Sequence, residues 1–316
     1  MKFHTEIPFD SNRFNQIDYN SKVLLLGSCF SENIGDKFAY FKFQCLINPL
    51  GILFHPKAIE TFITRVINNY HYTEADIFYH NELWHCFDAH SRLSHSSKDV
   101  LLKRLNTAVQ DTHLFLRDTS HIILTYGTSW VYRFIETDCL VANCHKVPQK
   151  KFIKELSSVE QMVECLDAID ALIKSVNPDI TVINTVSPVR HLKDGFVENT
   201  LSKSHLIAAI HDIIASNKNQ NYFPSYELMM DELRDYRFYA EDMLHPNHVA
   251  IDHIWSRFKK VWISTEAHSV IEEVDAIQKG LAHKPFHPDS DAHQSFLRQL
   301  ETRKDQIKSR FSHINF

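Results

Sequence analysis

A serine near the start of the chain and an Asp-x-x-His motif near its end are the residues best suited to catalysis. Ser28 stands in Gly-Ser-Cys-Phe after a short apolar segment, and Asp242 and His245 stand in Asp-Met-Leu-His-Pro. Catalysis by serine requires a base that accepts the hydroxyl proton and an acidic group that orients this base. The three-residue spacing lets Asp242 hold one imidazole nitrogen while the other faces the nucleophile. Each motif alone also fits a structural role, Ser28 as a helix cap and Asp-x-x-His as a surface turn.

Two further turns follow predicted strands and could supply hydrogen-bond donors that stabilise a developing oxyanion. The first is Asn-Pro-Leu-Gly at residues 48–51, where the amide of Gly51 could donate a hydrogen bond. The second is Gly-Thr-Ser-Trp at residues 127–130, where a small polar side chain such as Thr128 could add another donor. Simple β-to-α turns would explain both segments equally well.

Three other candidates have competing interpretations. Arg190 follows a predicted strand and either binds an acidic group of the substrate or pairs with a carboxylate. Cys29 could be a thiol nucleophile, but neighbouring residues in a tight turn generally point in different directions. Ser202 and Lys203 could form a dyad, but they lie at the start of a predicted helix, where a capping role is favoured.

The cysteines predict neither disulfides nor a metal site. The chain has six cysteines without a repeated spacing, and we expect them to be reduced. Cys139, Cys144 and His145 lack the second matched pair that a structural zinc site needs, and a hairpin explains their spacing. We expect neither a metal nor an organic cofactor.

Composition narrows the class of protein. The chain is 44% hydrophobic and 12% aromatic, which is enough for a core, and its formal net charge of −5 gives no electrostatic case for nucleic acid. Only six glycines occur, and neither Gly-rich phosphate-binding motif is present. The sequence contains no membrane-length apolar run, and residues 1–10 lack an apolar signal core. We therefore expect a cytoplasmic protein without membrane contact.

Apolar segments alternate with amphipathic ones along most of the chain. We predict buried strands at 22–26, 43–47, 121–125 and 180–185, one strand at 82–87, and a hairpin from 130–135 and 140–144. Helices are predicted at about 32–41 (capped by Ser31), 56–70, 97–116, 157–176, 201–216, 246–260, 265–282 and 290–312.

This alternation predicts a three-layer α/β domain with a mostly parallel sheet at residues 1–264. We expect an insertion around 71–118 and a C-terminal helical extension at 265–316 that packs on the domain or on a partner. Gly27, Gly51 and Gly127 all follow predicted strands, so they would line one edge of the sheet, where ligands bind in such folds.

Taken together, these motifs resemble the SGNH hydrolase superfamily and, more narrowly, the GSCFA family. The resemblance covers about residues 1–262, and the first motif continues with Ser31 in place of the family's alanine. The matching segments are GSCF (27–30), NPLG (48–51), GTSWVY (127–132), NCHKVP (143–148), TVSPVRH (185–191), YFPSYE (222–227), DELRDYRFY (231–239) and DMLHP (242–246).

The resemblance implies an SGNH-like α/β/α sandwich and ester hydrolysis or acyl transfer without a cofactor. Ser28 would be the nucleophile, His245 the general base and Asp242 its orienting partner, and the amides of Ser28 and Gly51 would form part of the oxyanion hole. The superfamily usually also supplies a Gly-x-Asn motif, whereas this chain has Gly-Thr-Ser at residues 127–129.

Four residues are candidates to replace the missing asparagine: Thr128, Ser129, Asn143 and Asn48. Our leading hypothesis is a serine-dependent esterase or deacylase that acts on a small or carbohydrate-linked acyl ester. The alternatives are an O-acyltransferase that uses the same three catalytic residues and a catalytically silent binding module with the same fold. The sequence predicts no oligomeric state.

Overall fold

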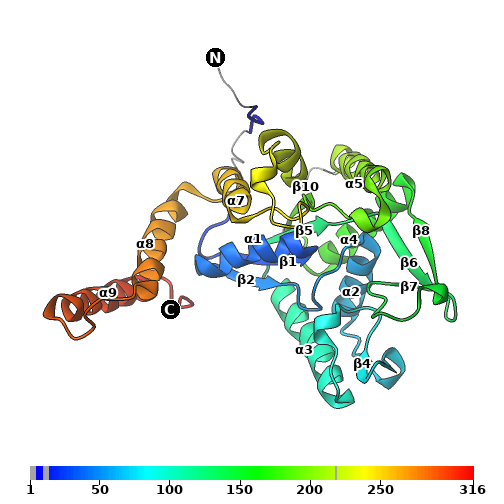
Figure 1. Cartoon of the computed structure of the whole chain (residues 1–316), viewed down its shortest axis with the longest axis horizontal. Helices are drawn as coiled ribbons and strands as arrows, with labels where there is room; N and C mark the ends of the chain where they lie inside the picture. Colours follow the sequence, from blue (N-terminus) through cyan, green and yellow to red (C-terminus); the bar gives the residue numbers. More distant parts are fainter. Residues whose placement is uncertain (1–4, 10–13, 218) are drawn as a thin grey trace.

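The computed structural model describes residues 5–9, 14–217 and 219–316. Within these residues, a central sheet of five parallel strands has the order β10-β9-β5-β1-β2 (Figure 1). The strands are β1 (Lys22–Gly27), β2 (Gln44–Ile47), β5 (His121–Tyr126), β9 (Thr181–Val186) and β10 (Gln220–Tyr222). Counted among themselves, these strands have the doubly wound order 2-1-3-4-5, which reverses direction between β1 and β5.

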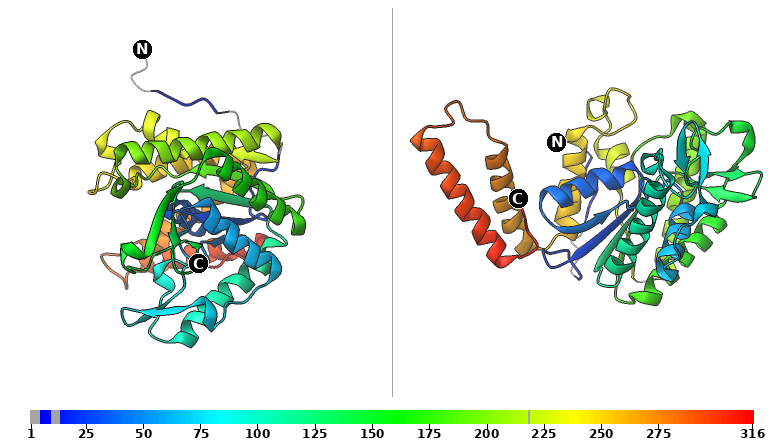
Figure 2. Two further views of the ribbon diagram at one scale, coloured as in Figure 1. Left: turned by 90° about the vertical axis from the view of Figure 1, so that its right-hand side faces the viewer. Right: turned by 90° about the horizontal axis from the view of Figure 1, so that it is seen from below.

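Helices cover both faces of this sheet and make the three layers that the sequence predicts (Figure 2). Alternate residues of β1 point to opposite faces, so Leu24 and Leu26 join one core while Val23 and Leu25 join the other. The first core includes α2 (Pro56–Asn68), α3 (Lys98–Leu116), α4 (Val159–Val176) and α5 (Phe196–Ser216). The second includes α1 (Cys29–Tyr40) and α7 (His248–Trp262).

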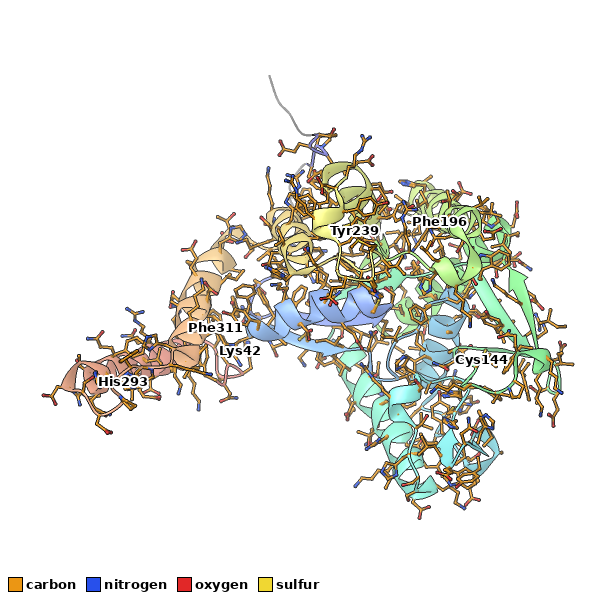
Figure 3. The ribbon with its side chains drawn as sticks, in the orientation of Figure 1. Lys42, Cys144, Phe196, Tyr239, His293 and Phe311 are labelled. Carbon is orange, nitrogen blue, oxygen red and sulfur yellow. The ribbon has the colours of Figure 1, made fainter. Side chains whose placement is uncertain are left out.

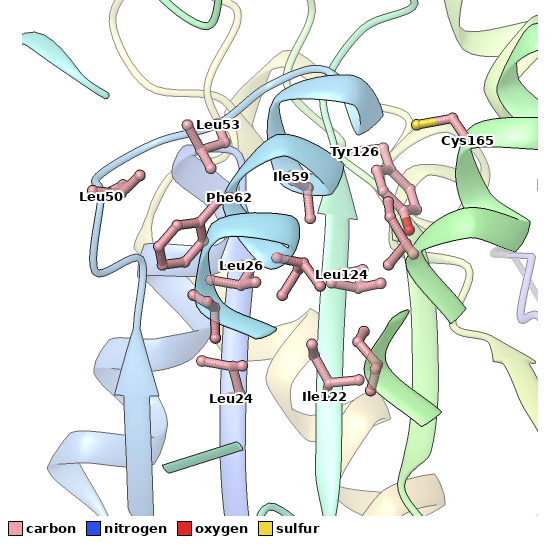
Figure 4. Packing of buried hydrophobic residues seen from close by; sticks show 14 of the residues in the cluster. Leu24, Leu26, Leu50, Leu53, Ile59, Phe62, Ile122, Leu124, Tyr126 and Cys165 are labelled. Carbon is pink, nitrogen blue, oxygen red and sulfur yellow. The ribbon is translucent and has the colours of Figure 1, made fainter. Parts of the chain in front are cut away.

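The first core fixes the position of the strand ends. Figure 4 shows Ile59 and Phe62 of α2 packed over Leu24 and Leu26 of β1 and Leu124 of β5. All these side chains are buried. Burying a side chain of this size stabilises the fold by about 1.5–3 kcal/mol, so the carboxyl ends of β1 and β5 are held firmly together.

Two small sheets are added to this framework. The hairpin β3 (Phe78–His80) and β4 (Leu83–His85) lies in the segment predicted as an insertion. The second sheet has the order β7-β6-β8, with β6 (Trp130–Phe134), β7 (Cys139–Val141) and β8 (Phe152–Leu156). The hairpin of β6 and β7 matches the prediction, whereas β8 was not predicted.

The C-terminal helices α8 (Thr265–Ala282) and α9 (Asp291–Arg310) form a hairpin that projects from the α/β domain (Figure 1). After α9 the chain returns to the domain, where the ring of Phe311 lies 5.1 Å from the ring of Tyr19. Figure 3 shows this return, with Phe311 beside Lys42 and His293 at the far end of the hairpin.

Several predicted boundaries need correction. Helix α1 begins at Cys29 with Ser28 as its N-cap, so Ser31 is not the cap. Helix α5 begins at Phe196, which places Ser202 and Lys203 inside the helix and not at its start. Helix α7 begins at His248 with Asn247 as its N-cap, two residues after the predicted start.

The remaining short elements are α6 (Ser225–Glu227), a π-helical turn at Leu228–Glu232, and 3-10 turns at Glu74–Asp76, Ser91–Leu93, Gln149–Lys151, Leu192–Asp194 and Tyr236–Phe238. Among the described helices, none is both long enough and apolar enough to cross a lipid bilayer. The prediction about a signal segment rests partly on residues 1–4 and 10, which lie outside the described residues.

Candidate active site

Gly27 allows β1 to turn sharply into α1 at Ser28. Its φ of +137° lies in a region that L side chains rarely adopt, and a Cβ atom there would stand 2.1 Å from the carbonyl oxygen of Thr125. The next residue, Ser28, donates its amide hydrogen to the same oxygen at 2.9 Å. The turn therefore lies against the end of β5, at the switch point of the sheet.

Ser28 is fully buried and caps α1. Its Oγ accepts a hydrogen bond from the amide of Phe30 at 3.3 Å. The hydroxyl thus lies at the positive end of the α1 dipole, which favours negative charge on a nearby atom. Among the described residues, no hydrogen bond joins Ser28 Oγ to His245.

The two backbone amides suggested for the oxyanion hole already have acceptors. The amide of Ser28 donates to Thr125, and the amide of Gly51 donates to the carbonyl oxygen of Asn48 at 2.7 Å. In this conformation, neither amide is a free donor. An oxyanion hole at this turn would therefore require a hydrogen-bond donor from a side chain.

Asn48 is the residue with such a donor beside the serine turn. Its Oδ1 accepts a hydrogen bond from the amide of Gly27 at 2.9 Å, which fixes the side chain against the turn. The residue is 2% exposed, and its Nδ2 has no hydrogen-bond partner. A buried amide without a partner is unfavourable by about 1–3 kcal/mol, so this group is suited to an acceptor that arrives with a ligand.

Asp242 and His245 form the pair that their spacing predicts. His245 Nδ1 lies 2.6 Å from Asp242 Oδ2, and Asp242 Oδ1 accepts hydrogen bonds from the amides of Leu244 and His245. These bonds, from the two amides and then from the imidazole, lower the pKa of Asp242 to about 2. An ionised carboxylate only accepts hydrogen bonds, so Nδ1 of His245 carries the proton and Nε2 is left as the base.

The backbone around this pair is closed into a loop. Tyr239 bridges to Pro246, and the amide of Ala240 donates to the carbonyl oxygen of His245 at 2.7 Å. Met243, between the two catalytic candidates, has a φ of +59°, an uncommon value for a residue other than glycine. The ordered loop therefore presets the Asp242–His245 geometry while both side chains remain about half exposed.

Lys203 lies buried at the carboxyl edge of the sheet, whereas the sequence favours a place at the start of a helix for it. Lys203 Nζ donates to the carbonyl oxygens of Gly127 and Ser187, each at 2.7 Å. These carbonyls follow β5 and β9, so one ammonium group connects two of the loops at that edge. Burial, and to a smaller extent the nearby charge of Arg190, lowers the pKa of Lys203 to about 7.

His191 lies near both Lys203 and His245. Burial, followed by the positive charge of Lys203, lowers the pKa of His191 to about 4. The His191 ring packs edge-on against Phe54 at 4.9 Å, and the carbonyl oxygen of Phe54 accepts the amide hydrogen of Gly127. The His245 loop, the loop after β9 and the loop after β5 therefore belong to one edge of the sheet.

The polar groups in the loop after β5 form hydrogen bonds with residues of α5. The amide of Ser129 donates to Ser202 Oγ at 2.8 Å, and Thr128 Oγ1 lies 2.9 Å from the same oxygen. Lys203 Nζ bonds only to backbone carbonyls in the described chain, so Ser202 and Lys203 do not form a dyad. Ser202 instead anchors the loop after β5, a contact that its predicted position at a helix start could not reveal.

Asn143 and Cys29 remain the weaker candidates. Asn143 Oδ1 accepts the backbone amide hydrogen of His145, and the backbone amide of Asn143 donates to the carbonyl oxygen of Phe87. These bonds hold Asn143 in the loop after β7. Burial raises the pKa of the Cys29 thiol, which disfavours the reactive thiolate. In the described part of the chain, no group of three or more His, Cys, Asp or Glu side chains could hold a metal ion.

Comparison with known proteins gives a family and a distant structural likeness. The model of the GSCFA family matches residues 22–258, and that of the GSCFA domain protein, C-terminal domain, matches residues 274–316. The crystal structure of a carbohydrate esterase family 3 from Talaromyces cellulolyticus aligns with a TM-score of 0.37 and 7% identity, over 81% of this chain and 99% of that chain. No curated protein sequence matches the chain. Because the first family model matches most of the chain, including both the serine turn and the Asp-x-x-His loop, this protein belongs to the GSCFA family.

Proposed function

We propose that the chain is a serine-dependent esterase or deacylase that acts on a small or carbohydrate-linked acyl ester. The main supporting observation is the Asp242–His245 pair, in which an ionised carboxylate orients the imidazole and leaves Nε2 as a base. This pair stands on an ordered loop at the edge of the sheet where Ser28 follows β1. Small-molecule or glycan esters are the proposed partners.

In the proposed reaction, Ser28 Oγ attacks the acyl carbonyl carbon as His245 Nε2 accepts the hydroxyl proton. The carbonyl oxygen becomes an oxyanion, and Asn48 Nδ2 donates a hydrogen bond to it. The tetrahedral intermediate then collapses, and His245 returns the proton to the leaving alcohol. His245 next activates a water molecule, which attacks the acyl-enzyme ester and releases the acid and Ser28.

A fluorophosphonate probe tests the nucleophile, because it labels only an activated serine. We expect labelling of the wild-type protein and no labelling of Ser28→Ala. Ser204→Ala is the matched control, since Ser204 is exposed on α5 and bonds only to the carbonyl oxygen of Thr200. Absence of wild-type labelling, or equal labelling of Ser28→Ala, would exclude the serine mechanism.

Hydrolysis of a short-chain aryl ester tests the base. His245→Ala should lose turnover, whereas His248→Ala, an exposed histidine at the first position of α7, should not. Equal activity in both variants would remove His245 from the mechanism.

A catalytically silent binding module is the second candidate. It is favoured by the complete burial of Ser28 and by the bonds that engage the amides of Ser28 and Gly51. The same probe separates the two candidates, since a silent module would leave Ser28 unlabelled. We also propose a cytoplasmic location, which the six free cysteines support.

A further inference from the structure

A pocket of about 370 Å³ opens beside the Asp-x-x-His loop. Its walls combine aromatic rings and arginines, and they include Tyr239 and Phe196, which Figure 3 shows on the same side of the molecule. Asp242 and Leu244 form the wall next to the proposed base. A group bound in this pocket would therefore be close to an ester under attack.

Two guanidinium groups line this pocket without a carboxylate partner. Neither Arg190 nor Arg234 forms an ion pair with any described residue. Arg190 Nη2 lies 3.0 Å from the thioether sulfur of Met230, a weak acceptor that neutralises no charge. Arg190 also lies close enough to Tyr239 to counteract part of the rise that burial causes in the pKa of this tyrosine, so the two side chains share the pocket wall.

The acidic groups of the pocket, by contrast, already have partners. Asp242 is bonded to His245, and Asp235 accepts the amide hydrogen of Arg237 and lies 3.8 Å from its Nε atom. Neither His245 nor Arg237 lines the pocket. Because His245 is neutral, Asp242 keeps its negative charge, but Arg190 and Arg234 together outweigh it. The pocket wall therefore carries a net positive charge.

Lys203 adds to this imbalance when its amine is protonated. The charge of Arg190 acts on Lys203 strongly enough to contribute, after burial, to its lowered pKa. Placing an arginine near a buried lysine is unfavourable unless an anion balances the charge. An incoming carboxylate would relieve this repulsion and accept the guanidinium hydrogens of Arg190 in a bidentate arrangement.

We propose that this pocket binds a carboxylate of the substrate, so that the preferred substrate is an acyl ester that also carries an acid group. This inference rests on the esterase activity proposed above. Arg190 would hold the carboxylate, Arg234 would add a second, more exposed positive charge, and the aromatic walls would pack against the apolar part of the ligand.

Two matched pairs of esters test this and separate the possible sources of the carboxylate. The first pair compares acetylated glucuronic acid with acetylated glucose, and in this pair the carboxylate lies on the alcohol side of the ester. The second pair compares the mono-4-nitrophenyl ester of adipic acid with its methyl ester, and in this pair the carboxylate lies on the acyl side. Charge-assisted hydrogen bonds of this kind are consistent with a preference of about 10- to 100-fold in kcat/KM for the acidic member of one pair.

Arg190→Gln should bring that ratio close to one, and Arg190→Lys should restore only part of it because an ammonium lacks the guanidinium's planar fork. Arg234→Gln, an exposed substitution that leaves the core intact, should lower the ratio less. Arg298→Gln is the control, since this exposed arginine lies on α9 and outside the pocket. Circular dichroism and thermal unfolding verify that each variant folds.

Calorimetric titration with free glucuronate and with glucose tests the site without any turnover. We expect the wild-type protein to bind glucuronate more tightly than glucose, and Arg190→Gln to lose the difference. Equal kcat/KM within both ester pairs, together with equal binding of the two sugars, would overturn the carboxylate site and leave the esterase proposal intact. Selective glucuronate binding with no ester turnover and no labelling of Ser28 would overturn the esterase and retain the site.

Discussion

Replacement of the buried Lys203 by methionine should change how the stability of the protein depends on pH. Lys203 is 1% exposed, and burial is the main reason that its pKa falls from 10.5 to about 7. In the unfolded chain the ammonium is solvated, and its pKa returns to the ordinary value. Between about pH 7 and pH 10.5, the unfolded state therefore binds one more proton than the native state.

A native state that binds fewer protons gains stability as the pH rises. Below about pH 7 both states hold the proton, and the full unfavourable effect of burying the charge is present. From pH 7 to pH 9 the contribution of Lys203 to the free energy of unfolding should rise by about 2 kcal/mol, because each pH unit within the window is worth about 1.4 kcal/mol. In Lys203→Met this contribution disappears.

Urea unfolding at pH 7, 8 and 9 measures the effect, with tryptophan fluorescence as the probe, since Trp255 and Trp262 are both buried. The stability difference between wild type and Lys203→Met should shift by about 2 kcal/mol in favour of wild type between pH 7 and pH 9. Lys103→Met, at an exposed position of α3, is the matched control and should show no shift. A difference between wild type and Lys203→Met that is constant with pH would mean that the bonds to two carbonyls keep Lys203 charged, and the reasoning would be refuted.

Three other substitutions test the catalytic edge. Gly27→Ala should destabilise the fold by about 3 kcal/mol or more in the same urea assay, because the added Cβ would meet the β5 backbone. Gly195→Ala is the control: its φ is also positive, but the added Cβ would meet the movable side chain of Glu198, so it should destabilise the fold less. Asp242→Asn should lower kcat by about 10³- to 10⁴-fold, since an amide no longer fixes the His245 tautomer; a wild-type rate for a short-chain aryl ester would contradict this. Asn48→Asp keeps the acceptor for the Gly27 amide but removes the free donor, and kcat should fall by about 10²- to 10³-fold; an unchanged kcat would exclude this donor.

The sequence predicts the parts of this fold in which a single local pattern decides the structure. Short segments with apolar centres, such as those of β1, β5 and β9, are typical of buried strands in the middle of a parallel sheet, and the structure confirms these strands. The helix at 265–282 matches its prediction, and its cap at Ser264 accepts the amide hydrogen of Ala267. Local hydrophobicity and capping suffice at these positions.

Prediction is wrong or incomplete where tertiary contacts override the local pattern. Strand β10 is a short polar segment, Gln220–Tyr222, which becomes a strand only because it pairs with β9. Strand β8 mixes charged and apolar residues and depends on β6 for its hydrogen bonds. Two serines near α1 are plausible caps by type, and the choice of Ser28 follows from the sharp turn at Gly27.

The chemistry of the edge shows the same division. The Asp242–His245 contact is local, so its spacing predicts it, and the structure contains it. Lys203 and Asn48 owe their character to burial and to partners far away in the chain, and no neighbouring residue signals either property. A lysine inside an amphipathic helix is usually exposed, and Lys203 stands between Ser202 and Ser204, so its burial is not apparent in the sequence.

The missing asparagine has a structural counterpart that supports the choice of Asn48. A Gly-x-Asn motif would supply its donor from the loop after β5, but here the amide of Ser129 and the carbonyl oxygen of Gly127 are bound by residues of α5. That loop is therefore turned toward α5. A hydrogen-bond donor beside Ser28 must then come from the loop after β2, the other strand that pairs with β1. The loop after β2 begins with Asn48, whose Oδ1 accepts the amide hydrogen of Gly27 and whose Nδ2 is buried without a partner. We infer that the donor has moved from the loop after β5 to the loop after β2, because Asn48 Nδ2 is a buried donor without a partner among the described residues and lies beside the serine turn.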